Sequence, residues 1–121
     1  MEKQVYISEI EREKCRKVAE AYSELYEEDD ILVLDAGGYG FVKLQYYRPS
    51  NGFDGVTTFT DSRKLFDNLW EEWRNTQLLI LTKGTAMAEM DYEEMIKCMP
   101  KEKQDELLEK RNYFAQKAGI V

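Results

Sequence analysis

Histidine is absent from the 121 residues, and only two cysteines and two prolines occur. Because histidine supplies most general bases and many transition-metal ligands, its absence excludes Ser-His-Asp and Cys-His triads within this chain. The two cysteines, Cys15 and Cys98, form no C-x-x-C pair, so the sequence has neither a zinc knuckle nor a dithiol redox motif. We therefore expect a protein that is not an enzyme and that holds no metal and no cofactor.

Long hydrophobic stretches are also missing. The longest aliphatic runs, Ile31–Leu34 and Leu78–Leu81, have four residues each, whereas a membrane-spanning helix needs about 20. The first residues are too charged for a signal peptide, and two isolated cysteines are typical of a reducing compartment. The length fits one domain. We expect a cytoplasmic, soluble protein that forms a single α+β domain over residues 1–121.

Negative charge is what the sequence has in excess. The chain carries 24 acidic and 17 basic residues, a formal net charge of −7. Residues 1–30 alone hold ten acidic and five basic side chains, and they end in the run Glu27, Glu28, Asp29 and Asp30. A negative field disfavours contact with phosphate backbones and favours basic partners. The run lacks the ligand spacing and the glycine of a calcium loop, so we interpret it as a solvated helix end or a docking patch for a basic partner.

The hydropathy pattern predicts a helix followed by three strands. Ser8 and Glu11 have the spacing of a capping box, and apolar residues then recur at steps of three and four until the helix ends near residues 27–30. The predicted strands are Ile31–Leu34, Phe41–Tyr47 and Val56–Thr60. Glycines between the first two strands indicate a tight hairpin. Three strands in this order are typical of an antiparallel meander.

The remainder of the chain predicts helices. One begins at Thr60 or Asp61, but Leu78–Thr82 has two interpretations, a buried strand or a continuation of this helix. We favour continuation, since no proline or glycine interrupts the run before Gly84. A capping box at Asp91 and the Pro100 that follows it predict two further helices. The predicted fold class is α+β, with an N-terminal helix, a three-stranded antiparallel meander and two or three C-terminal helices packed mainly on one face of the sheet.

The candidate binding residues follow from that arrangement. The alternation along Phe41–Tyr47 places Val42, Leu44 and Tyr46 on one face and Phe41, Lys43, Gln45 and Tyr47 on the other. The helices can cover only one face of the sheet. We expect the face with Phe41 and Lys43 to be free; the alternative is that the last helix or a second copy of the chain covers it. Aromatic residues and arginine are typical of interaction hot spots. The predicted binding residues are Tyr39, Phe41, Lys43, Tyr47, Arg48, Phe53, Glu27, Glu28, Asp29 and Asp30.

Residues 38–44 resemble the RNP1 strand of the RNA-recognition motif family, and residues 5–10 resemble its RNP2 strand. In that family, aromatic rings on the sheet stack on bases. The resemblance implies that single-stranded RNA would stack on Tyr6, Tyr39 and Phe41. The sequence departs from the family where Gly37 replaces a basic residue and Leu44 replaces an aromatic one, and its net charge opposes binding of a polyanion.

Three functional hypotheses follow. The leading one is a small acidic, non-enzymatic interaction domain that binds a protein partner or a second copy of itself. The alternative is a single-stranded RNA-binding domain, and a third is an enzyme that uses the carboxylates of Asp35 and Asp54, although nothing in their spacing pairs them. The glycines after Asp35 precede a strand, whereas a phosphate-binding loop leads into a helix, so we interpret them as a hairpin turn.

Overall fold

The computed structural model describes residues 6–25 and 30–120, apart from the side chains of Arg48 and Asp54. Its helices and strands follow the predicted order. They are α1 (Glu9–Leu25), β1 (Ile31–Asp35), β2 (Phe41–Tyr47), β3 (Gly52–Phe59), α2 (Ser62–Thr82), α3 (Tyr92–Cys98) and α4 (Lys101–Ala118). Short 3-10 turns lie at Gly37–Tyr39, Arg48–Ser50 and Ala86–Glu89. The predicted α+β fold class is confirmed.

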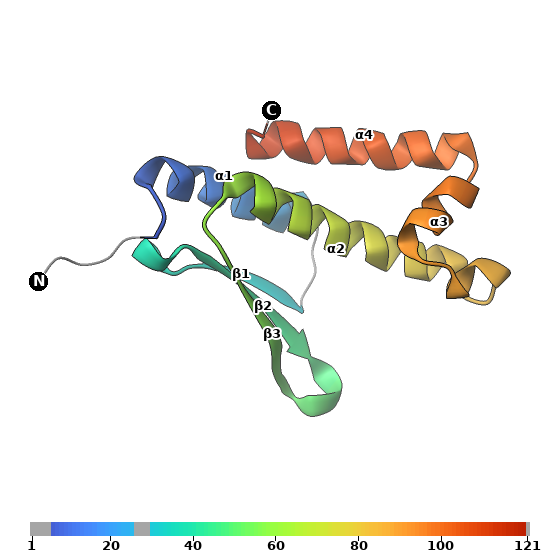
Figure 1. Ribbon diagram of the computed structural model, residues 1–121, viewed down its shortest axis with the longest axis horizontal. Helices are drawn as coiled ribbons and strands as arrows, with labels where there is room; N and C mark the ends of the chain where they lie inside the picture. The colour runs from blue at the N-terminus through green and yellow to red at the C-terminus, as the bar shows by residue number, and fades with distance from the viewer. Residues whose placement is uncertain (1–5, 26–29, 121) are drawn as a thin grey trace, which may run out of the picture.

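The elements form three layers, which Figure 1 shows from the side. The antiparallel sheet, with strand order β1-β2-β3, is the lowest layer. Helices α1 and α2 lie next to each other above it, and α4 packs across both of them on the side away from the sheet. The β2–β3 hairpin extends beyond the helices. One face of the sheet is therefore covered by helices, and the other has no element of the described chain over it.

Side-chain caps fix where the first two long helices begin. The Ser8 hydroxyl accepts a hydrogen bond from the Glu11 backbone N–H at 3.1 Å, as the predicted capping box requires. Glu11, however, turns toward α2, where its carboxylate accepts from the Ser62 backbone N–H and hydroxyl, both at 3.1 Å. Asp61 caps α2 from its own side by accepting from the Lys64 N–H. The carboxylate of Glu11 thus ties the first turn of α1 to the first turn of α2.

The run Leu78–Thr82 continues α2, as favoured from the sequence. Leu78 and Thr82 lie one helical turn apart, and both are buried. The Thr82 hydroxyl lies 4.0 Å from the sulfur of Met95, which is buried on α3. Because α3 folds back onto this turn, the last part of α2 is supported by packing on one side although it extends past the sheet.

The hairpin between β1 and β2 depends on Gly40. Its φ of +107° lies in a region that side chains rarely adopt, and a Cβ there would lie 2.5 Å from the Phe59 carbonyl oxygen. Gly40 also accepts a hydrogen bond from the Ala36 N–H at 2.8 Å. The glycines that indicated a hairpin in the sequence are therefore structural, and the chain continues from them into a strand and not into a helix.

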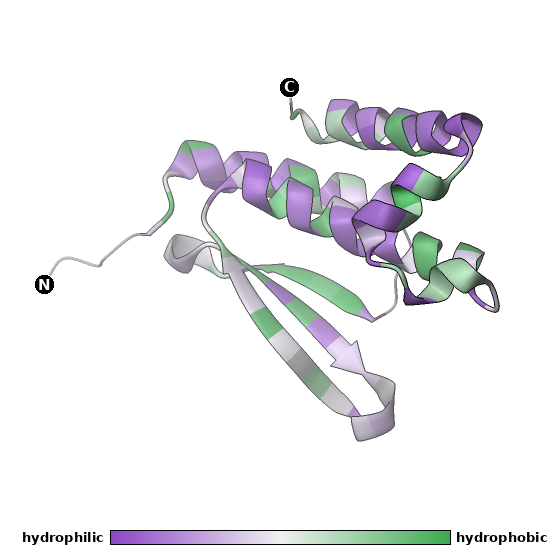
Figure 2. Cartoon of the chain, turned by 45° about the vertical axis from the view of Figure 1, so that its right-hand side comes forward, coloured by the Kyte–Doolittle hydropathy of each residue, from purple (hydrophilic) through white to green (hydrophobic). Residues whose placement is uncertain are grey.

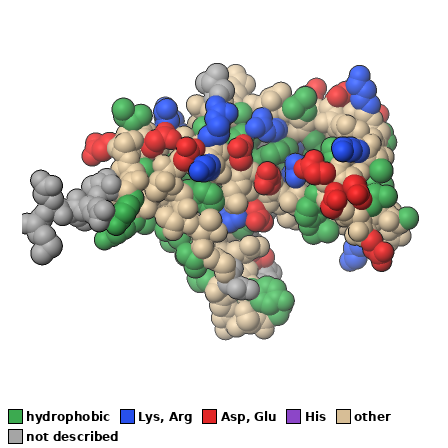
Figure 3. Space-filling view, in the orientation of Figure 1, with side chains coloured by type: hydrophobic (Ala, Val, Ile, Leu, Met, Phe, Trp, Pro, Cys, Tyr) green, Lys and Arg blue, Asp and Glu red, His purple; other side chains and the backbone are tan. Residues whose placement is uncertain are grey.

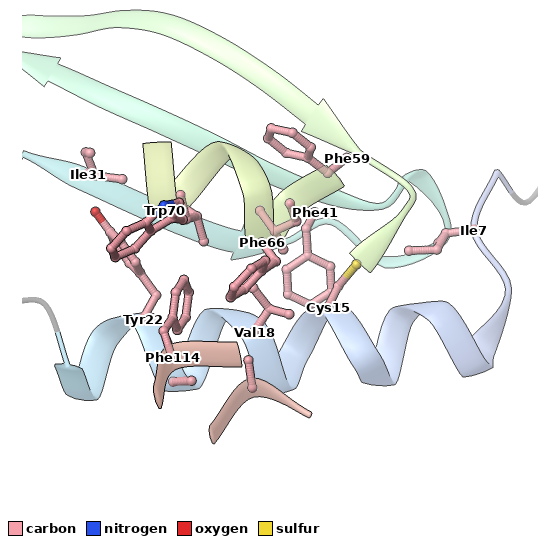
Figure 4. Close-up of a cluster of buried hydrophobic side chains, with 14 residues drawn as sticks. Ile7, Cys15, Val18, Tyr22, Ile31, Phe41, Phe59, Phe66, Trp70 and Phe114 are labelled. Atoms are coloured by element: carbon pink, nitrogen blue, oxygen red, sulfur yellow. The ribbon is translucent and has the colours of Figure 1, made fainter. Parts of the chain in front are cut away.

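The core lies between the sheet and the helices (Figure 4). Phe114 of α4 reaches down between α1 and α2, and its ring centroid lies 4.6 Å from that of Phe66. All members of the cluster are buried. They are Ile7, Cys15, Val18, Ala21, Tyr22, Ile31, Phe41, Phe59, Leu65, Phe66, Leu69, Trp70, Phe114 and Ala118. Burial raises the pKa of the Cys15 thiol to about 11, so this cysteine stays protonated at neutral pH.

Truncation of Phe114 tests this packing. We expect Phe114→Ala to lower the free energy of unfolding by about 3–5 kcal/mol, because the cavity lies at the junction of three helices. The matched control is Tyr113→Ala on the same helix, whose ring is exposed and whose loss should change stability by less than about 0.5 kcal/mol. Urea unfolding measures both values, and equal losses in the two variants would contradict the arrangement.

Candidate interaction surfaces

The helices cover the opposite face of the sheet from the one predicted. Phe41 and Lys43 point into the helices, and their exposed fractions are 2% and 5%. Ile31 and Phe59 point the same way from the neighbouring strands and are also buried. The prediction that Phe41 and Lys43 lie on a free face is therefore wrong. Both faces of β2 carry apolar side chains, so the alternation gave the two faces correctly but could not decide between them.

Lys43 is held under α2 by polar contacts that the sequence did not reveal. Its ammonium group lies 2.6 Å from Asn68 Oδ1 and 3.0 Å from Glu72 Oε1. Asn68 and Glu72 stand one turn apart on α2, so they meet the lysine side by side. A buried cation needs such partners to offset its lost hydration. Lys43 therefore joins the sheet to α2 and is not available to an external ligand.

The uncovered face, which we call the outer face, is apolar and lacks charge. Strand register places its residues in rows, with Leu32 opposite Leu44 and Leu34 opposite Val42. On the other side of β2, Val56 lies opposite Leu44 with an exposed fraction of 66%. None of its eight positions is charged. They are Leu32, Leu34, Val42, Leu44, Tyr46, Phe53, Val56 and Thr58.

This composition is unusual for a sheet with one free face. Antiparallel strands with one solvated side normally alternate apolar and polar residues, whereas strands covered on both sides are apolar throughout. The strand β1 is hydrophobic over most of its length (Figure 2). In the view of Figure 3, most charged side chains lie over the helices and few over the sheet. The unbroken run Ile31–Leu34 was the sequence signal for an outer face that requires a cover.

The remaining predicted residues lie in different places. Phe53 belongs to the outer face, where its ring meets that of Tyr46 edge-on at 5.3 Å. Tyr47 is exposed near the far end of the hairpin, and Tyr39 is exposed at the opposite end of the sheet. These aromatic residues therefore form no single patch. The side chain of Arg48 and the acidic residues Glu27, Glu28 and Asp29 lie outside the described residues, whereas Asp30 is half-buried where β1 begins.

The aromatic platform that the RNP1 resemblance implied is not formed. The rings of Tyr6 and Tyr39 stack at a centroid distance of 5.9 Å and are both exposed, but the ring of Phe41 is buried among the helices. Leu78–Leu81 lie in α2, so among the described residues the sheet has three strands. The prediction that Phe41 is accessible for base stacking is wrong.

A second apolar surface lies on the part of α2 that extends past the sheet. Leu79, Ile80 and Leu81 are all at least half exposed, and Ile80 reaches 64%. Three consecutive helical residues span more than half of the helix circumference, so α3 and α4 cover only the side with Leu78. This surface is narrower than the outer face and comes from one helix.

A groove separates α1 from β1. It is an open groove of about 440 Å³, and its apolar lining consists of Phe41, Val33 and Ala19. The remaining lining residues are polar or charged. They are Arg16, Glu20, Ser23, Glu24 and Asp35.

Asp35, in the lining of this groove, is held by two arginines and a backbone N–H. Arg12 donates to both of its carboxylate oxygens, at 2.9 and 3.2 Å from Oδ2 and 3.0 Å from Oδ1, and Gly37 N–H donates at 2.9 Å. Arg16 adds a longer contact of 3.4 Å. These contacts, the hydrogen bond from Arg12 above all, lower the pKa of Asp35 to about 2. A carboxylate held in this state is a poor proton acceptor, and it joins α1 to the end of β1.

Among residues 6–25 and 30–120, no three His, Cys, Asp or Glu side chains are grouped so that they could hold a metal ion. The described helices include none that is long and apolar enough to span a membrane. Comparisons with protein-family models, with curated proteins and with solved structures found no match.

The ion pairs of Asp35 predict a specific loss of stability in acid. Its pKa in the folded chain lies below the unfolded value of about 3.9, so its stabilisation is complete above that pH and disappears as the pH falls toward 2. Asp35→Asn should lower stability at neutral pH by about 1 kcal/mol and should flatten the decline below pH 4. Glu106→Gln, which removes an exposed pair with Lys103, is the control. Parallel stability curves for wild type and Asp35→Asn would contradict this assignment.

Proposed function

We propose that this chain is a non-enzymatic interaction module that binds a second copy of itself through the outer face of its sheet. One observation supports the proposal: the outer face is exposed, apolar and uncharged. Contiguous exposed apolar surface on a soluble chain is typical of an interaction site. The buried position of Cys15 and the lack of a disulfide among the described residues favour a cytoplasmic location.

A second copy suits the outer face because of its charge. The chain has a net charge of −7, so most arrangements of two copies bring like charges together. The outer face is an exception, because none of its eight positions is charged and two such faces can meet without repulsion at their centre. A strongly basic partner, in contrast, would find no carboxylate at these positions.

The geometry also suits two stacked sheets. Sheets pack face to face about 10 Å apart with their strands nearly aligned. Two copies joined in this way would form a sandwich, with the α1–α2 layers outside and the β2–β3 hairpins within reach of the opposite copy. Tyr46 and Phe53, whose rings already meet edge-on, would lie at the rim of the contact and supply the aromatic side chains that are enriched in interfaces.

The competing hypotheses have weaker support. An RNA-binding sheet needs Phe41 on its surface, and Phe41 lies in the core. Enzymatic use of Asp35 needs a free carboxylate, whereas Arg12, Arg16 and the Gly37 N–H already bind it. Neither hypothesis explains why the outer face is apolar.

Light scattering coupled to gel filtration tests the proposal. The mass of the wild-type chain should rise to twice its 14.3 kDa as the protein concentration is raised to about 0.5 mM. Val56→Glu places a carboxylate on the outer face beside Leu44 of the central strand and should give a monomer, because the interface would then bury like charges. Leu34→Lys, on a different strand of the same face, should have the same effect.

The matched control is Ile80→Glu on α2. Ile80 and Val56 are nearly equally exposed, at 64% and 66%, and both substitutions add one carboxylate. Ile80→Glu should remain a dimer. A wild type that is monomeric throughout, or a dimer that Ile80→Glu disrupts and Val56→Glu does not, would overturn the proposal. Circular dichroism of each variant shows whether it has kept its fold.

A further inference from the structure

The outward edge of β1 has unused hydrogen-bonding groups. Asp30 accepts from the Tyr46 N–H at 2.7 Å, and Ala36 donates to the Gly40 carbonyl at 2.8 Å. Antiparallel pairs alternate between residues that bond across the ladder and residues that do not. With this register, the N–H and C=O of Leu32 and Leu34 point to β2. The same groups of Ile31, Val33 and Asp35 point away from the sheet, and no backbone hydrogen bond outside the ladder uses them among the described residues.

The α1–β1 groove lies directly beside that edge. Its floor contains Val33 from the edge strand and Phe41 from the strand behind it, while Ala19 closes it from α1. An extended segment laid along β1 would form main-chain hydrogen bonds on one side and place alternate side chains into the groove. The groove, at about 440 Å³, has room for two or three small apolar side chains.

The charge of the groove selects the ligand. Glu20, Glu24 and Asp35 contribute three carboxylates, but Asp35 is bound by Arg12 and Arg16, and Glu24 pairs with Lys117. The guanidinium of Arg16 is itself engaged, since it contacts Asp35 and also pairs with Glu13. Glu20 and Glu24 stand one turn apart on α1. Glu20 forms no ion pair among the described residues, so the helical wall offers one unpaired carboxylate beside the Glu24–Lys117 pair, above an apolar floor.

We propose that the α1–β1 groove binds an extended segment of a basic protein by adding a strand to the outward edge of β1. On the face of the segment that points toward α1, small apolar side chains enter the groove over Val33 and Phe41. A lysine or arginine at the next position on that same face, two residues along the segment, pairs with Glu20 or Glu24. This surface is distinct from the outer face, so the inference does not depend on self-association.

A second copy fits the edge of β1 less well, and a segment fits the edge of β3 less well. A second copy pairing β1 with β1 would bring two α1 helices together along their acidic sides, which costs like-charge repulsion. The free edge of β3 is a poorer site for a segment, because the register shift opposite Leu44 and Tyr46 and the positive φ of Gly55 make it irregular. Irregular edges are a common protection against strand addition.

Hydrogen exchange of labelled protein gives a direct test. In the free chain, the amide of Val33 should exchange at least about ten-fold faster than those of Leu32 and Leu34, since only the latter two bond to β2. The probe is a set of peptides of about nine residues. Threonine occupies every second position. The positions between the threonines hold, in turn, a basic residue (lysine or arginine) and an apolar one (valine or leucine). At about 1 mM peptide, at least one should slow exchange at Val33 by about ten-fold or more and leave Leu32 and Leu34 unchanged.

Controls separate strand addition from general attraction. The same peptides with glutamate in place of the basic residues, or with N-methyl groups on alternate amides, should not protect Val33. The double variant Glu20→Lys with Glu24→Lys should weaken binding by about ten-fold or more. Its matched control is Glu102→Lys with Glu106→Lys on α4, which has the same spacing and charge change and likewise removes one partner of a lysine, since Glu24 pairs with Lys117 and Glu106 with Lys103.

Three results would overturn the proposal. They are a Val33 amide that no basic peptide protects, protection that survives N-methylation, and equal losses in the two double variants. Val33→Pro offers an independent check. It removes the outward N–H without touching the ladder to β2, and proline is tolerated on edge strands, so it should fold and bind the peptides at least about ten-fold more weakly.

Discussion

The sheet of this protein has apolar side chains on both faces, and the chain has helices for only one of them. The placement of the helices over one face determines which apolar side chains are buried and which stay exposed. Phe41 and its neighbours on the inner face bury themselves against α1 and α2, and Phe114 of α4 seals the two helices from above. What remains is a layer of leucine, valine and aromatic residues in contact with water. The hydrophobic effect opposes that exposure, and association is the simplest way to remove it.

Polar contacts determine how helices α1 and α2 lie on the sheet. The carboxylate of Glu11 binds the first turn of α2, Lys43 reaches up from the sheet to Asn68 and Glu72, and the guanidinium of Arg12 grips Asp35 at the end of β1. Each contact joins two different elements, so together they set the positions of the helices over the strands. They also occupy most of the charged groups near the sheet. The groove between α1 and β1 has the carboxylates of Glu20 and Glu24 on its helical side, and neither takes part in these three contacts.

The sequence alone was enough to locate the helices and strands, but it was not enough to tell which face of the sheet the helices cover. Caps at Ser8 and Asp91, the glycines of the first hairpin and the uninterrupted run before Gly84 each act locally, and the helices and strands formed in the predicted order. The third strand is longer than predicted, because it begins at Gly52 and not at Val56. The choice of buried face is not local. Phe41 and Lys43 alternate with Val42 and Leu44, and a lysine on one face argued for solvent. Lys43 is buried because Asn68 and Glu72 lie above it, 25 and 29 residues later in the chain, and no pattern along the strand could reveal that.

The most direct test of the account is to see which protons of two copies touch. A sample that mixes isotope-labelled and unlabelled chains reports only contacts between copies. If two outer faces pack together, intermolecular nuclear Overhauser effects should connect the methyl groups of Leu44 and Val56 with the outer face of the other chain. Such effects centred on Leu79, Ile80 and Leu81, or their complete absence at high concentration, would contradict it.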